Sequence, residues 1–134
     1  MPVIPPVADS DDAFFWEGAK AGRLLLNRCA HCHAIVHPPV PMCGDCLSTE
    51  WETVEASGRG RVYTWIVSRH PSDSTAVPRI VALVALPEGV RVVSNLVDIE
   101  AADVHNEMEV EVTFVDYDTC TLPQFRPTDR AAHR

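Results

Sequence analysis

The sequence has few basic residues, and this shortage limits the classes of partner that it suits. Its 134 residues include 11 Lys and Arg against 19 Asp and Glu, which gives a formal net charge of −8 at pH 7. Proteins that bind nucleic acids usually present a basic face that displaces counterions from the phosphates. The charge balance therefore disfavours nucleic-acid binding, and a nucleic-acid-binding module is kept only as the alternative function.

Long apolar segments are also missing. No segment approaches the ~18 apolar residues that a helix needs to span a bilayer. The first residues, Met1–Pro6, show neither the basic region nor the long apolar region of a secretory signal peptide. We therefore expect a cytoplasmic protein without a membrane partner. In that compartment thiols stay reduced, so paired cysteines indicate metal ligands before disulfides.

The familiar catalytic and nucleotide-binding motifs are absent as well. The Gly-Arg-Gly at residues 58–60 matches neither a dinucleotide-binding loop nor a P-loop, and no G-x-S-x-G or H-E-x-x-H occurs. Cys120, His70 and His105 each stand without a catalytic neighbour in the sequence. An enzyme that uses one of these isolated groups for catalysis is a further alternative hypothesis. The sequence favours a binding or scaffold module without catalytic residues of its own.

What the sequence does contain is a pair of metal-ligand motifs. Cys29-x-x-Cys32 and Cys43-x-x-Cys46 are separated by ten residues, and each can form a knuckle that points two thiolates at one centre. Four thiolates satisfy tetrahedral Zn²⁺, and because no position is left for water, such a site is structural rather than catalytic. Iron in a rubredoxin-like site takes the same ligands. Zinc is therefore the expected metal, with iron as the alternative.

The remaining pattern is mainly β and predicts four successive units. They are an arm and short helix over 1–22, with Ser10–Asp12 at the helix start, a rubredoxin-like zinc ribbon over 23–50, a barrel over 51–127 and a flexible tail over 128–134. Expected strands cover 51–56, 61–70, 80–86, 90–97 and 107–117, and an extended piece covers 122–127. A short helix or turn before the last long strand favours a five-stranded OB-fold barrel over an SH3-like barrel.

The order of these parts resembles a known family, the zinc-ribbon/OB-fold proteins called domain of unknown function thirty-five. The resemblance rests on an aromatic helix before the first knuckle, on Pro38-Pro39 before the second, and on Gly58-x-Gly60-x-Val62-Tyr63-x-Trp65 after it. It continues with Val81–Leu86, Val110-x-Val112-x-Phe114 and Leu122–Pro127, and so covers residues 12–127.

This resemblance implies an accessory subunit rather than an enzyme that acts alone. Family members pair with thiolase-superfamily enzymes, namely thiolases, acyltransferases and steroid side-chain aldolases, and others pair with MaoC-type hydratases. We therefore expect a scaffold within a hetero-oligomer that docks a thiolase-fold partner and helps to hold an acyl-CoA thioester. The apolar strands and the Leu122–Pro127 segment are the expected docking surface, by edge addition or by packing.

A CoA thioester that touches this chain would need cations for its phosphates. Residues 51–97 form the segment with a positive balance, because they carry five basic and four acidic residues. Aromatic rings in the same segment offer stacking surfaces. The candidate CoA-binding residues are Arg59, Arg61, Tyr63, Trp65, Arg79 and Arg91.

The sequence departs from the family pattern at positions where glycine is usual. His33 and Leu47 follow the second cysteine of each knuckle, and Asn106 or Glu107 replaces the glycine before the last long strand. Glycine suits a backbone with positive φ, and asparagine tolerates that conformation better than most residues. We expect a slight effect on the knuckle geometry and no loss of the metal.

Overall fold

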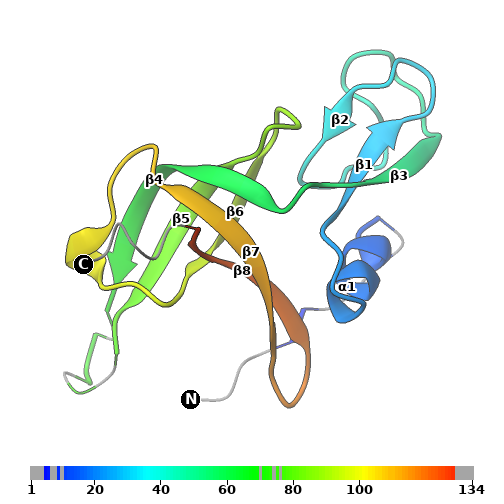
Figure 1. Cartoon of the computed structure of the whole chain (residues 1–134). Coiled ribbons are helices and arrows are strands. Elements are labelled where there is room, and N and C mark those ends of the chain that lie inside the picture. The colour runs from blue at the N-terminus through cyan, green and yellow to red at the C-terminus, as the bar shows by residue number, and fades with distance from the viewer. Residues whose placement is uncertain are drawn as a thin grey trace.

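The computed structural model describes residues 5, 6, 9, 11–69, 71–73, 75 and 77–128. In it, one short helix and a small three-stranded sheet stand beside a closed five-stranded barrel (Figure 1). This arrangement confirms the predicted mainly-β class with an N-terminal helix. The expectations for most of the arm, for Ser10 at the helix start, for His70 and for the tail beyond residue 128 lie outside the described residues.

The first element is the helix α1, Ala13–Lys20, which follows an ordered turn. The carboxylate of Asp9 accepts hydrogen bonds from the backbone N–H groups of Asp11 at 2.8 Å and Asp12 at 3.2 Å. Turns of this kind position the start of a helix. Phe15 is buried on one face of the helix. Gly22 ends the segment with φ of +75°, a left-handed conformation that glycine adopts without strain.

A small antiparallel sheet follows the helix. Its strands are β1 (Leu25–Cys29), β2 (Ile35–Val36) and β3 (Trp51–Glu55), in the order β2-β1-β3. The sequence predicts that the strand at residue 51 begins the barrel, but all five residues of β3 pair with β1. It does so because the ladder with β2 occupies one edge of β1 and leaves the other edge for β3. The cysteine-bearing sheet therefore extends to Glu55, beyond the boundary predicted at residue 50.

The rest of the described chain forms the barrel. Its strands are β4 (Arg59–Ser68), β5 (Arg79–Ala85), β6 (Arg91–Leu96), β7 (Glu109–Asp116) and β8 (Thr121–Pro127), closed in the order β4-β5-β6-β8-β7. The 3-10 turn η1 (Ala101–Asp103) precedes β7, where the sequence predicts a short helix or turn. This topology confirms the five-stranded OB-fold barrel.

Strand β8 contains the extended piece that the sequence predicts over Leu122–Pro127. All seven of its residues pair with β7, and Phe125 also pairs with Leu96 of β6. The side chain of Phe125 is fully buried in the core. The extended piece predicted over 122–127 is therefore a paired strand of the barrel.

A β-bulge changes the face that β4 presents to the core. The residues of β5 that pair with Val62 and Thr64 are consecutive, so Tyr63 is the extra residue. Strict alternation predicts Val62 and Ile66 on one face, but Val62 is fully buried and Ile66 is 64% exposed. Beyond the bulge, Trp65 packs against the core instead.

Helix α1 contacts β1 of the small sheet and β8 of the barrel (Figure 1). Phe15 of the helix, Leu26 of β1 and Val110 of β7 belong to one buried cluster. Gly18 suits the close approach of α1 to the following segment, because a Cβ there would lie 2.9 Å from the backbone carbonyl oxygen of Arg23. The helix, the sheet and the barrel therefore share one core.

Candidate metal centre and candidate CoA surface

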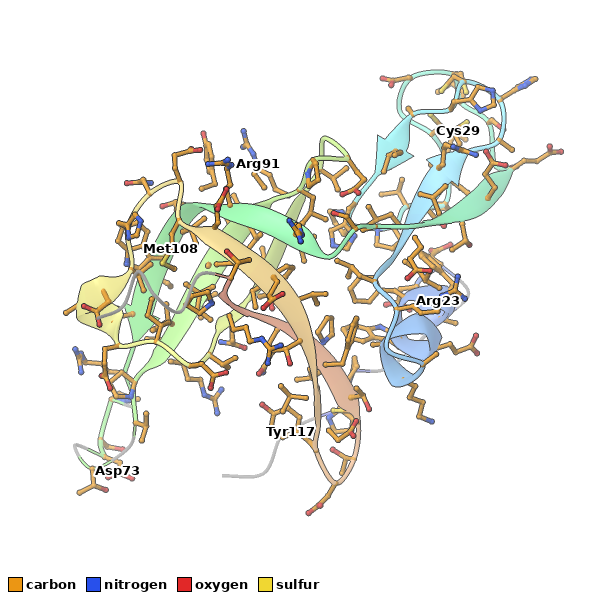
Figure 2. The ribbon with its side chains drawn as sticks, viewed as in Figure 1. Arg23, Cys29, Asp73, Arg91, Met108 and Tyr117 are labelled. Atoms are coloured by element: carbon orange, nitrogen blue, oxygen red, sulfur yellow. The ribbon has the colours of Figure 1, made fainter. Side chains whose placement is uncertain are left out.

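Four cysteine sulfurs form one cluster, and Figure 2 shows one of the four residues, Cys29, at the tip of the small sheet, away from the barrel. The Sγ atoms of Cys29, Cys32, Cys43 and Cys46 all lie within 4.8 Å of one another. The distances are 3.5 Å between Cys29 and Cys46 and 3.6 Å between Cys32 and Cys43. Four sulfurs bonded at ~2.3 Å to one tetrahedral ion stand ~3.8 Å apart. The four predicted ligands therefore have the spacing needed to bind one metal ion.

The two knuckles repeat the same backbone turn. The N–H of His33 donates to the carbonyl of Cys29 at 3.0 Å, and the N–H of Leu47 donates to that of Cys43 at 2.9 Å. Each turn closes in the left-handed region, with φ of +67° at His33 and +66° at Leu47. Glu107, the third departure from the family pattern, has φ of +67°. The backbone thus keeps the conformation that glycine favours at all three places, although the residues are not glycine.

Replacing His33 or Leu47 with glycine is expected to stabilise the metal-loaded chain by ~1 kcal/mol each, because glycine removes the cost of a left-handed side chain. Leu47 is 67% exposed, so little burial is lost with its side chain. Urea unfolding of each variant measures the effect. His31→Gly is the matched control on the same loop, since His31 has no positive φ, and it is expected to lower stability. A gain of the same size in that control would contradict the interpretation.

Backbone N–H groups and neighbouring thiols shift the pKa values of the cysteines in opposite directions. A hydrogen bond from the N–H of Cys32, with a smaller one from His31, lowers the pKa of Cys29 to about 6 against the effect of burial. The N–H of Ala34 favours the thiolate of Cys32, but partial desolvation and the neighbouring thiols raise its pKa to about 12. A central cation removes this competition, because it favours all four thiolates together. Metal binding and ordering of the knuckles are therefore coupled.

The isolated Cys120 and His105 side chains do not lie together. Cys120 is half-buried in the turn between β7 and β8. His105 is exposed in the segment between η1 and β7, where its Nδ1 lies 3.3 Å from the carbonyl of Asp103. The structure therefore places them in separate loops, and neither joins the cysteine cluster.

Four of the six candidate CoA-binding residues gather at one end of the barrel. Arg61 of β4 and Arg91 of β6 both lie opposite Ala85 of β5, and Arg59 begins β4. The guanidinium carbon of Arg91 lies 3.9 Å from the centre of the Tyr63 ring, a cation–π contact. We call Arg59, Arg61, Tyr63 and Arg91 the arginine patch; Figure 2 shows Arg91 on the barrel, apart from Cys29.

The other two candidates lie elsewhere. Arg79 pairs with Ser68 at the opposite end of the β4–β5 ladder, six residues or ~20 Å along β5 from Ala85. Trp65 packs against the core and is only partly accessible. The six candidates therefore do not form one site.

A cavity of about 610 Å³ beside the arginine patch carries both signs of charge. Arg61 donates to the carboxylate of Glu109 at 3.1 Å, and Glu107 and Glu111 line the same cavity. These carboxylates compete with a phosphate for the guanidinium groups of Arg59 and Arg61. Arg91 does not line this cavity, so it is the better-placed cation of the patch.

Sheet, knuckles and barrel together define a class: a rubredoxin-like zinc ribbon joined to an OB-fold barrel. The family model for the zinc ribbon domain of ChsH2 matches residues 16–52, and the model for its C-terminal OB-fold domain matches residues 53–115. The chain belongs to this DUF35 family of zinc-ribbon/OB-fold proteins. No described helix has the length and apolar character needed to cross a membrane.

Relatives and a solved structure agree with this assignment. A DUF35 domain-containing scaffold protein of Methanocaldococcus jannaschii is 34% identical over 74% of this chain and 73% of its own. A probable enoyl-CoA hydratase alpha subunit of Thermomonospora curvata is 45% identical over 91% of this chain, which spans 39% of that relative's length. A chain of the solved Ltp2-ChsH2(DUF35) aldolase matches with a TM-score of 0.87 and 44% identity, over 93% of this chain and all of its own.

Proposed function

We propose that the chain is a non-catalytic scaffold unit of an acyl-CoA-processing complex and that it docks a partner with the thiolase fold. The observation that carries the proposal is its similarity, at 44% identity and a TM-score of 0.87, to a chain of the Ltp2-ChsH2(DUF35) aldolase. The relatives named as a scaffold protein and as a hydratase subunit support the same role. The partner would be a thiolase, an acyltransferase or a steroid side-chain aldolase.

The ion of the ribbon is proposed to be Zn²⁺ with a structural role. Cys29, Cys32, Cys43 and Cys46 would hold it, and four protein ligands leave no position for a substrate. The bound ion supplies a cross-link between the two knuckles. Elemental analysis of the purified chain is expected to find one zinc per chain, and visible absorption from an iron–thiolate centre would contradict this assignment.

Copurification followed by an activity assay tests the scaffold role. The tagged chain, expressed in its own cell, is expected to retain a thiolase-superfamily protein in stoichiometric amount. Acyl-CoA turnover is expected to require that partner and to be absent from the chain alone. Recovery of the chain alone or with nucleic acid, or turnover by the isolated chain, would contradict the proposal.

We also propose that the arginine patch contacts the CoA part of the substrate, chiefly through Arg91 stacked on Tyr63. Arg91→Ala is expected to weaken CoA-thioester binding by the assembled complex about tenfold, through loss of one charge-assisted hydrogen bond. Arg79→Ala is the matched control, since Arg79 lies at the far end of the same strands. Calorimetric titration measures the CoA-thioester affinity of complexes that contain each variant. An unchanged affinity for Arg91→Ala would show that the arginine patch does not contact the CoA.

A further inference from the structure

A second hollow lies between β6 and β8, next to helix α1. It has a volume of about 290 Å³, and its walls come from α1, from the loop at His37–Pro39 and from both strands. Phe15 and Trp16 supply its aromatic lining. We call this hollow the β6–β8 groove. It belongs neither to the metal centre nor to the arginine patch.

The groove exists because β6 and β8 pair at one position. The two strands are parallel, and their ladder consists of the pair Leu96–Phe125. Before that pair, the hydroxyl of Ser94, and not a backbone N–H, donates to the carbonyl of Pro123 at 2.8 Å. The backbones of β6 and β8 therefore do not pair along the groove.

The edge of β6 that faces the groove has backbone groups that the barrel does not use. The N–H of Leu86 donates to the carbonyl of Val90 at 2.9 Å, and hydrogen-bonded positions alternate along an antiparallel pair. Positions 92, 94 and 96 therefore bond to β5, and Val93 turns its N–H and C=O toward β8. In the described part of the chain, no ladder pairs Val93 with β8. Val93 is also 70% exposed.

One residue of the groove wall, Gln124, also has an unsatisfied buried acceptor. Gln124 is 5% exposed and lines the groove; its Nε2 donates to the hydroxyl of Tyr117 at 3.0 Å. Its Oε1 is buried without a hydrogen bond among the described residues, as is Nδ1 of His37. An unsatisfied buried carbonyl costs ~1–3 kcal/mol, which a ligand that donates to it recovers.

The charge of the groove is negative. Asp12 lines it, and hydrogen bonding to the backbone N–H of Asp9 lowers the pKa of the Asp12 carboxyl. Among the described residues that line it, none is Lys or Arg. A phosphate-bearing ligand is therefore disfavoured, and a ligand with N–H donors and a positive end is favoured.

From the open strand edge, the buried Gln124 carbonyl and the Asp12 carboxylate, we infer that the groove binds a short extended peptide segment of a partner protein. The segment is apolar at its centre and ends in Lys or Arg. Its backbone bonds to Val93, its central N–H donates to Gln124 Oε1, its apolar side chain packs on Phe15 and Trp16, and its basic end meets Asp12. Strand edges and side-chain pockets are combined in this way in other peptide-binding proteins.

The test uses the metal-loaded chain and the synthetic peptide acetyl-Val-Leu-Lys amide. In ¹H–¹⁵N spectra, titration is expected to shift the backbone amide of Val93 and the side-chain amide of Gln124. The same peptide with a methylated central amide nitrogen lacks the donor and is expected to bind about tenfold more weakly. Equal binding of the two peptides would overturn the inference.

Val93→Pro and Val93→Thr form the decisive pair of variants. Proline removes the N–H that faces the groove without removing a bond to β5, and edge positions tolerate it. It is expected to weaken peptide binding about tenfold, whereas Val93→Thr keeps the N–H and is expected to change binding less than about twofold. Metal content and urea midpoint verify that both variants are folded.

Other occupants would give different results. If indole shifts the Val93 and Gln124 amide signals as much as the peptide does, the groove binds a small apolar ligand. If the same signals shift when the protein concentration is raised without peptide, the groove binds a second copy of the chain. Either result would overturn the inference. Unchanged peptide binding by Val93→Pro would do the same. Since the test needs no enzyme partner, its failure would leave the proposed scaffold role as it stands.

Discussion

Loss of the metal is expected to melt the ribbon tip while the barrel stays folded. Between residues 29 and 50 the buried side chains are those of Cys29 and Cys43, and the regular structure is the two-residue strand β2. The tip therefore has almost no apolar core of its own. Structural zinc sites of this type contribute ~10–16 kcal/mol of binding free energy. Cys43→Ser, which removes a buried ligand, is expected to abolish stoichiometric zinc binding near pH 7.

Amide spectra and metal analysis check this expectation. Signals of residues 29–50 are expected to move to unfolded positions in Cys43→Ser, and signals of β4–β8 are expected to persist. Cys120→Ser is the matched control, because Cys120 lies outside the cluster, and it should retain one metal and a native spectrum. A native ribbon spectrum after complete metal removal would show that the ion does not hold this part of the fold.

Deleting the chain from Thr121 onward is expected to unfold the barrel. The deletion removes β8, which pairs with β7 along its whole length and closes the barrel against β6. It also removes Phe125 from the centre of the core. Phe125→Ala alone is expected to cost ~3–5 kcal/mol, a large part of the ~5–15 kcal/mol that stabilises a typical domain. The deletion therefore tests the fold and cannot isolate the docking of a partner.

Circular dichroism and urea unfolding measure both effects. Deletion of residues 129–134 is the matched control, since it removes no barrel strand among the described residues. Tyr63→Ala controls for the loss of an aromatic side chain, because Tyr63 is 46% exposed, and it is expected to cost less than ~1 kcal/mol. A native spectrum after deletion from Thr121, or similar midpoints for the two alanine variants, would contradict the central place of β8.

The metal site was predictable because its geometry is local. Two residues between cysteines bring both thiols of a pair to one side of a tight turn, and Cys29 and Cys43 occupy equivalent places in two equal turns. The barrel strands were also predictable, because apolar and polar residues alternate along most of Glu109–Asp116 and because Arg79–Ala85 is an almost continuous apolar run. Both features depend on residues close together in the chain.

What the sequence could not specify depends on pairing between distant residues. Trp51–Glu55 has the pattern of a barrel strand, and only its ladder with β1 assigns it to the ribbon. The bulge at Tyr63 cannot be inferred from alternation, yet it decides that Trp65 faces the core. Gln124 gave no sequence signal for the β6–β8 groove, since a polar residue on a strand usually faces solvent.

The contacts of helix α1 couple the metal centre to the β6–β8 groove. The helix bridges β1 and β8, and the loop that carries His37, between the two knuckles, forms part of the groove wall. We expect loss of the ion to free that loop and so to remove one wall of the groove. Because binding linkage is reciprocal, a ligand in the groove raises the affinity for the ion by the same factor by which the ion raises the affinity for the ligand. Recognition on the barrel would thus follow zinc supply, although the ion never touches the bound molecule.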